Sequence, residues 1–158
     1  MELHKKVADF SLQTDENKTV SLSGYKGKPV VLFFYPRADT PGCTIEACGF
    51  RDAFTKLRKA GAVVLGISRD TPAAQAKFKA KYDLPYTLLC DVDEKVCNQF
   101  GVLKEKNMYG KKVWGIERTT FVIGPDQTLL HVFPKVTPEG HAEQVLALVE
   151  EWKKAAGR

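Results

Sequence analysis

Two cysteines lie five residues apart, directly after a loop rich in proline and glycine. Cys43 and Cys48 stand in the run YPRADTPGCTIEAC, residues 35–48. The prolines and the glycine favour a turn, and the apolar residues that follow recur at three- and four-residue spacing, the pattern of a buried helix face. We therefore expect Cys43 to lie in the first turn of a helix, where unpaired amides and the helix dipole favour a thiolate. A thiolate is a nucleophile, so the pair of cysteines predicts redox chemistry.

The second cysteine does not face the first while this helix is intact. Five residues at 100° per residue place Cys48 about 140° around the helix from Cys43, on the polar side with Asp52 and Thr55. The helix radius and rise put the two Cα atoms roughly 8.5 Å apart, whereas a disulfide rarely tolerates more than about 7 Å. A disulfide between the two cysteines therefore requires the first turns of the helix to unwind.

These residues resemble the active site of a peroxiredoxin, and in particular of the bacterioferritin comigratory protein, or peroxiredoxin Q, branch. Pro36, Thr40 and Cys43 match the family pattern Pro-x-x-x-Thr-x-x-Cys, and Cys48 matches the second cysteine of the branch. The resemblance covers nearly the whole chain. The similar segments outside the motif are residues 22–35, 108–111 and 115–123. The resemblance implies a thiol-dependent peroxidase that reduces hydrogen peroxide and organic hydroperoxides.

The resemblance also implies a role for each residue of the motif. Cys43 is the peroxidatic cysteine, which becomes a sulfenic acid, and Cys48 is the resolving cysteine, which converts the sulfenic acid into an intramolecular disulfide. Thr40 hydrogen-bonds the peroxide and Pro36 shields the pocket from water; without the resemblance, a helix cap and a turn proline would be favoured. Thioredoxin or a similar dithiol then reduces the disulfide. The sequence has no C-x-x-C motif, which indicates a substrate of such a reductase and not a reductase itself.

Two charged residues could support the thiolate. Arg118 lies in a strand predicted over residues 114–123, on the same face as several apolar residues. A permanent cation on a buried face requires an anion, and a thiolate would serve, although an arginine on an exposed edge strand would give the same pattern. Glu46 follows Cys43 by three residues on the same side of the helix. It could pair with Arg118, or it could be a glutamate on the helix surface.

The other cysteines and the histidines are weaker candidates. Cys90 closes a predicted strand and Cys97 lies in a predicted helix, and both are typical of small core residues. Cys97 stays a second candidate for the resolving role, because some relatives place that cysteine in another helix. The cysteine spacings fit no common zinc site, and His4, His131 and His141 are scattered along the chain. We expect no metal and no cofactor.

The hydrophobic pattern predicts one α/β domain over residues 1–158, compatible with a thioredoxin-like fold. Such a fold, which the resemblance also implies, has a central mixed β-sheet flanked by helices, here with an N-terminal β-hairpin extension. We expect a basic loop over residues 104–113. The expected strands are residues 7–12, 19–22, 30–35, 62–68, 86–90, 114–123 and 129–133. The expected helices run from near residue 43 to a stop at 61, from 72 to 82, from 93 to 100, and from 137 or 138 to about 156.

Charge and hydropathy exclude several other classes of function. The chain has 24 Lys and Arg against 19 Asp and Glu, a net charge of +5, but these residues are dispersed over predicted helices and a loop. Solvated surfaces explain them, and we do not expect nucleic-acid binding. No stretch approaches the roughly eighteen apolar residues of a membrane span, and residues 1–9 lack the apolar core of a signal peptide. We expect a cytoplasmic protein, and the resemblance implies a monomer.

Two further functions could use the same features. A peroxide-sensing switch or binding protein would form the same disulfide, and catalytic turnover with excess peroxide and reductant distinguishes an enzyme from it. A holdase chaperone would expose apolar patches, whereas the apolar residues of this sequence fall into regular elements. We therefore expect an enzyme.

Overall fold

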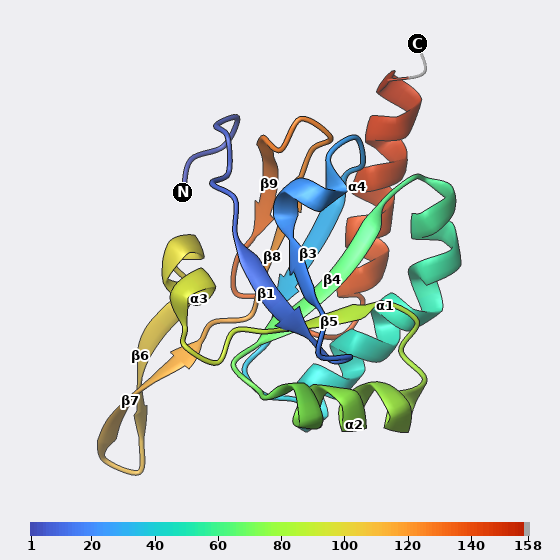
Figure 1. The fold of residues 1–158 in the computed structure, drawn as a ribbon. Coiled ribbons are helices and arrows are strands. Elements are labelled where there is room, and N and C mark those ends of the chain that lie inside the picture. Colours follow the sequence, from blue (N-terminus) through green and yellow to red (C-terminus); the bar gives the residue numbers. More distant parts are fainter. Residues whose placement is uncertain (157–158) are drawn as a thin grey trace.

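The computed structural model describes residues 1–156 and contains a seven-stranded mixed sheet with helices on both faces (Figure 1). The strand order is β2-β1-β5-β4-β3-β8-β9. The three central strands, β5, β4 and β3, are parallel, and the strands on either side of them are antiparallel. The strands of this sheet are β1 (Ser11–Thr14), β2 (Thr19–Ser21), β3 (Val30–Phe34), β4 (Val63–Ser68), β5 (Thr87–Cys90), β8 (Thr119–Ile123) and β9 (Leu129–Phe133). The predicted α/β class, with a mixed sheet and an N-terminal hairpin, is confirmed.

Strand β3 separates two apolar cores, because alternate side chains of a strand point to opposite faces. Val31 and Phe33 pack beneath α1 (Pro41–Lys59) and α4 (His141–Ala156). Leu32 and Phe34 pack on the other face with α3 (Lys95–Phe100) and the N-terminal segment. All residues of β3 are buried, which agrees with its unbroken run of apolar residues. The strand ends at the loop that leads into α1.

Helix α1 begins directly after the loop, at the place that the prolines and the glycine of the loop predicted. Thr40 is its N-cap, with extended backbone, and Pro41 is its first residue, a position that proline favours because its φ is already helical. Cys43, Ala47, Phe50 and Leu57 are buried along one side of α1. The stripe predicted from the three- and four-residue spacing therefore faces the sheet, and Cys43 lies in the first turn.

The two shorter helices begin at side chains that accept hydrogen bonds from backbone amides. Thr71 caps α2 (Pro72–Tyr82), its hydroxyl accepting from the amide of Ala74 at 3.2 Å. The carboxylate of Asp91 accepts from the amides of Val96 and Cys97 at 3.1 and 2.6 Å, at the start of α3. Such bonds satisfy amides of the first helical turn that have no partner within the helix.

The prediction of a basic loop over residues 104–113 was wrong. This segment forms β6 (Leu103–Met108) and β7 (Lys111–Ile116), a separate two-stranded ribbon that projects from the body of the molecule (Figure 1). Tyr109 and Gly110 make the turn with positive φ, a pair of values typical of tight hairpins. The ribbon is rich in lysine, and apolar and polar residues do not alternate clearly along it. The hydrophobic pattern of the sequence therefore did not predict these strands.

The other large differences from the predicted boundaries concern three elements, while α3 begins at Lys95, two residues later than predicted. Residues 114–123 are not one strand, because β7 ends at Ile116 and β8 begins at Thr119 in a different sheet. Strand β1 begins at Ser11, since the preceding segment instead bonds to the turn before β9, with the amide of Val7 donating to the carbonyl of Gln127. Helix α4 begins at His141 and not at residue 137 or 138, after Gly140 with a φ of 75°.

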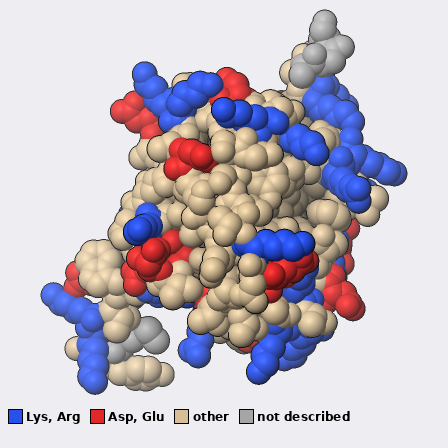
Figure 2. Space-filling model, viewed as in Figure 1, with Lys and Arg blue, Asp and Glu red and all other residues tan. Residues whose placement is uncertain are grey.

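The surface charges are mixed. Figure 2 shows basic and acidic side chains interspersed over the visible face, in agreement with the dispersed lysines and arginines of the sequence. Within residues 1–156, no helix combines the length and the apolar character needed to cross a membrane.

Candidate active site

The sulfur of Cys43 lies beside the guanidinium of Arg118. Nη2 of Arg118 is 3.4 Å from Sγ of Cys43, and Nη1 donates to Oε1 of Glu46 at 2.9 Å. Cys43 is 1% exposed and the side chain of Glu46 is fully buried. One cation therefore bridges a thiol and a carboxylate inside the protein. The sequence left two alternatives for Glu46, a pairing with Arg118 or a position on the helix surface. The structure contains the pairing.

Arg118 comes from a different element than predicted. It lies in the two-residue link between β7 and β8, not within a strand. The amide of Val136 donates to its carbonyl at 2.8 Å, which fixes the link against the segment before α4. The side chain is 14% exposed, so it is buried for most of its length, as the prediction of a buried cation required.

The two charges of the ion pair respond differently to burial. Burial raises the pKa of Glu46 to about 7, although Arg118 opposes the shift. Oε2 of Glu46 is buried and has no hydrogen-bond partner in the described part of the chain. For Arg118, burial lowers the pKa, but Glu46 and Cys43 raise it by more, so the net shift is upward. The guanidinium stays charged, and Glu46 is the partner that titrates.

Gly42 makes room for the guanidinium. A Cβ atom on Gly42 would lie 3.0 Å from Nη2 of Arg118 and 3.5 Å from Cγ of Pro138. The backbone of α1 approaches Arg118 closely because residue 42 has no side chain. The sequence marked this glycine only as a turn residue.

The loop before α1 is held by Asp70, which lies between β4 and α2, and by the last residues of α2. The amide of Ala38 donates to Oδ2 of Asp70 at 2.8 Å, and the hydroxyl of Ser68 donates to the same oxygen at 2.6 Å. Asp39 accepts from Lys81 and Tyr82 at 2.9 and 2.8 Å. The sequence did not identify Asp70, because its contact with Ala38 depends on β4 lying beside β3 in the sheet.

Thr40 and Pro36 both lie half-buried in this loop. Thr40 occupies the N-cap position of α1, but its hydroxyl donates to the carbonyl of Arg37 at 2.9 Å and makes no hydrogen bond to an amide of the helix. Pro36 directly follows Tyr35, which is fully buried. Their roles toward a peroxide stay predictions.

The four cysteines are free thiols in three different environments. Cys48 is half-buried and lies in α1 with Cys43. Cys90 and Cys97 are buried, and burial raises the pKa of Cys90 to about 12 and that of Cys97 further. Cys97 also packs in the core on the opposite face of the sheet from Cys43. Of the three other cysteines, Cys48 is therefore the one that can meet Cys43 by a change confined to a single helix.

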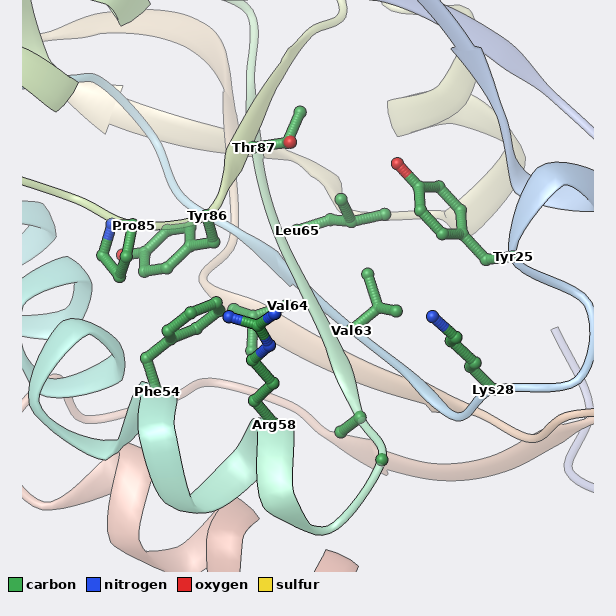
Figure 3. Close-up of a pocket in the computed structure, with 12 residues that line it drawn as sticks. Tyr25, Lys28, Phe54, Arg58, Val63, Val64, Leu65, Pro85, Tyr86 and Thr87 are labelled. Atoms are coloured by element: carbon green, nitrogen blue, oxygen red, sulfur yellow. The ribbon is translucent and has the colours of Figure 1, made fainter.

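The histidines and the cavity in Figure 3 lie outside this cluster. His141 is buried with Nε2 2.7 Å from the hydroxyl of Thr120, and burial lowers its pKa. Among residues 1–156, no group of three His, Cys, Asp or Glu could hold a metal ion. A cavity of about 480 Å³ is lined by the second half of α1, the start of β4 and the residues before β5, and no cysteine lines it (Figure 3). Arg58 in its wall follows Cys43 by fifteen residues, about 22 Å along a helix.

Comparison with known proteins gives a consistent result. Residues 3–132 match the model of the AhpC/TSA family. A Coxiella burnetii protein with the name peroxiredoxin bcp is 53% identical over 146 residues, which are 92% of this chain and 97% of the relative. Peroxiredoxin Bcp of Escherichia coli K12 is 44% identical over 90% of this chain and 91% of its own.

Solved structures of similar proteins have the same fold. A structure of Xanthomonas campestris peroxiredoxin Q superposes with a TM-score of 0.87, at 40% identity over 91% of both chains. A cysteine-to-serine mutant of Xylella fastidiosa PrxQ gives a TM-score of 0.91, at 34% identity over 96% of both chains. The thioredoxin-like fold predicted from the sequence is confirmed.

Proposed function

The chain belongs to the AhpC/TSA family and is a thiol-dependent peroxidase, a peroxiredoxin, and we propose that Cys43 is its peroxidatic cysteine and Cys48 its resolving cysteine. The observation that supports this assignment is the position of Cys43. Its sulfur lies in the first turn of α1 and 3.4 Å from a guanidinium that is held by a buried carboxylate. Both features give the sulfur the electropositive environment that is typical of reactive cysteines.

In the first step, the thiolate of Cys43 attacks one oxygen of the peroxide. A sulfur–oxygen bond forms, the oxygen–oxygen bond breaks, and the leaving oxygen takes up a proton to become water or an alcohol. Cys43 is then a sulfenic acid. Arg118 stabilises the thiolate and the charge that develops on the departing oxygen. Thr40, whose hydroxyl proton is donated to the carbonyl of Arg37, accepts a hydrogen bond from the bound peroxide, and Pro36 limits the access of water.

In the second step, Cys48 attacks the sulfenic sulfur of Cys43. The sulfur–sulfur bond forms, the sulfur–oxygen bond breaks, and water leaves. Both cysteines lie in α1, which is helical over Pro41–Lys59. The first turns of α1 must therefore unwind before the two sulfurs can bond. The half-buried position of Cys48 makes the disulfide accessible to a dithiol such as thioredoxin, which restores both thiols by exchange.

We further propose that the chain acts as a single domain and a monomer in the cytoplasm, where such reductants keep thiols reduced. Analytical ultracentrifugation of the reduced and the oxidised protein tests the monomer. A dimer that persists at micromolar concentration would contradict this part of the proposal.

Peroxide consumption by point variants tests the assignment of the cysteines. We expect the wild type to consume many equivalents of peroxide in the presence of thioredoxin and its reductase. Cys43→Ser should have no activity, and Cys48→Ser should react once and then stall. Cys97→Ser is the matched control, since it removes a buried thiol from the other core and should turn over like the wild type. Full turnover by Cys43→Ser would refute the assignment, and a wild type that stops after one equivalent would indicate a peroxide-sensing switch.

A further inference from the structure

A buried hydrogen bond joins the core to the part of α1 that must unwind. Tyr86, just before β5, donates from its hydroxyl to the carbonyl of Ala47 at 2.6 Å. Ala47 lies between Cys43 and Cys48 in the helix. Tyr86 therefore bonds to the backbone of the segment whose conformation decides whether the two cysteines can meet.

The ring of Tyr86 is fixed from several sides. Tyr86 is 3% exposed, and its ring lies 5.7 Å from that of Phe33 and 6.2 Å from that of Phe54, centroid to centroid. Figure 3 shows Tyr86 and Phe54 lying next to each other in the cavity wall, with Phe54 extending from α1. Burial raises the pKa of Tyr86 well above its ordinary value, so its hydroxyl remains a donor at physiological pH. If Ala47 left the helix, this buried hydroxyl would lose its partner, which is costly in a core.

Two glycines bracket the cysteines in α1. Gly42 precedes Cys43 and Gly49 follows Cys48, and glycine weakens a helix because it has more conformational freedom when unfolded. Just beyond Gly49, Nη1 of Arg51 donates to the carbonyl of Tyr82 at 2.9 Å and ties the rest of α1 to the end of α2. The intrinsically weak part of α1 is thus residues 42–49, and Tyr86 holds its centre.

We propose that Tyr86 is a positioning residue that keeps residues 42–49 helical and thereby limits the rate at which Cys48 reaches the sulfenic acid on Cys43. The inference rests on the proposed roles of the two cysteines. Tyr86 takes no part in the bonds that form or break, since the thiol of Cys48 supplies the sulfur and the proton with which water leaves. It changes only the population of the unwound segment from which this reaction occurs.

Rapid mixing of reduced protein with peroxide separates the two steps. The rate of the first phase, oxidation of Cys43, is proportional to peroxide concentration, whereas that of the second, disulfide formation, is independent of it. In Tyr86→Phe the second phase should be about 2- to 10-fold faster, the factor expected for loss of one neutral buried hydrogen bond, and the first should stay within twofold. Fewer molecules should then reach sulfinic acid at high peroxide, because disulfide formation competes with the second oxidation.

Two further variants make the test specific. Gly49→Ala should slow the second phase by about fivefold, because alanine strengthens the helix interior, and its Cβ would lie 3.4 Å from that of Ala142, an ordinary contact. Gln127→Met is the matched control. It also removes a buried 2.6 Å hydrogen bond to a carbonyl, that of Leu22, but away from α1. It should leave both phases unchanged although it lowers the melting temperature.

The possible outcomes distinguish this inference from the proposed function. If the wild type forms no Cys43–Cys48 disulfide, the proposed function fails. If the wild type forms it but Tyr86→Phe resolves at the wild-type rate, or if Gln127→Met accelerates resolution equally, the inference about Tyr86 is overturned and the proposed function stands. Should Tyr86→Phe not fold, an unchanged second phase in Gly49→Ala overturns the inference by itself.

Discussion

Replacing Arg118 by methionine should slow the reaction of Cys43 with peroxide while leaving the fold intact. Methionine keeps much of the length and apolar volume of the side chain but removes the guanidinium that lies 3.4 Å from the sulfur. A hydrogen bond to a charged group contributes about 1.5–3 kcal/mol. Since about 1.4 kcal/mol corresponds to a factor of ten in rate, the second-order rate constant at pH 7 should fall roughly 10- to 150-fold.

The same substitution has a separate effect on stability, which must be removed from the comparison. Arg118→Met leaves the buried carboxylate of Glu46 without its cation, and breaking a buried ion pair in this way typically costs about 3–5 kcal/mol. Part of that cost is avoided because Glu46, with a pKa already raised to about 7, can take up a proton. In the double variant Arg118→Met/Glu46→Gln no buried charge is left unpaired, so its stability should recover toward that of the wild type.

Stopped-flow measurement of single oxidation, together with urea unfolding of each variant, separates the two effects. We expect the single and the double variant to be equally slow with peroxide, although only the single variant is clearly less stable. A single variant within threefold of the wild-type rate would refute the role given to Arg118. So would a double variant that regains the wild-type rate, because the loss would then have come from the fold and not from the missing charge.

Three further predictions follow from the same geometry. Gly42→Ala should slow the oxidation step by about tenfold, because its Cβ would lie 3.0 Å from Nη2 of Arg118 and displace the guanidinium; an unchanged stopped-flow rate would contradict the close approach. The pKa of Glu46 in the folded protein, about 7, lies above the ordinary value of 4.5 for a glutamate exposed to water, so ionisation favours the unfolded chain between these values. The wild type should therefore lose stability relative to Glu46→Gln as pH rises from 4.5 to 7 in urea titrations, and a difference that does not change with pH would show that the carboxyl is not shifted. Cys90 and Cys97, whose pKa values are raised by burial, should react slowly with iodoacetamide in the native reduced protein at pH 8. Mass spectrometry detects the alkylated cysteines, and rapid alkylation of either residue would be inconsistent with its burial.

The sequence predicted best what depends on local chemistry. The turn residues before α1 and the spacing of the apolar side chains placed Cys43 correctly in the first helical turn. The start of α2 at Pro72 was predicted correctly, because proline favours the first position of a helix. For Glu46 the sequence left two alternatives, a pairing with Arg118 or a position on the helix surface. A buried cation requires an anion, but the sequence does not show whether the face that carries Arg118 is buried.

The sequence did not predict what depends on contacts between distant segments. The bonds from Tyr86 to Ala47 and from Ala38 to Asp70 join residues that are 39 and 32 positions apart. No local pattern marks such pairs, since each depends on which strands become neighbours. The ribbon of β6 and β7 was missed for another reason. It has no apolar face of the kind that makes strands recognisable, and the turn at Tyr109 and Gly110 with its cross-strand pairs defines it.

The roles of the two cysteines are tested most directly by the intact mass and disulfide map of the fully reduced protein after one equivalent of peroxide. We expect the loss of two hydrogens and a single link between Cys43 and Cys48, with Cys90 and Cys97 still free. A link from Cys43 to Cys97, or a stable sulfenic acid on Cys43 while Cys48 remains a thiol, would contradict the proposed resolving step. A protein without any change in mass would contradict the assignment of Cys43 itself.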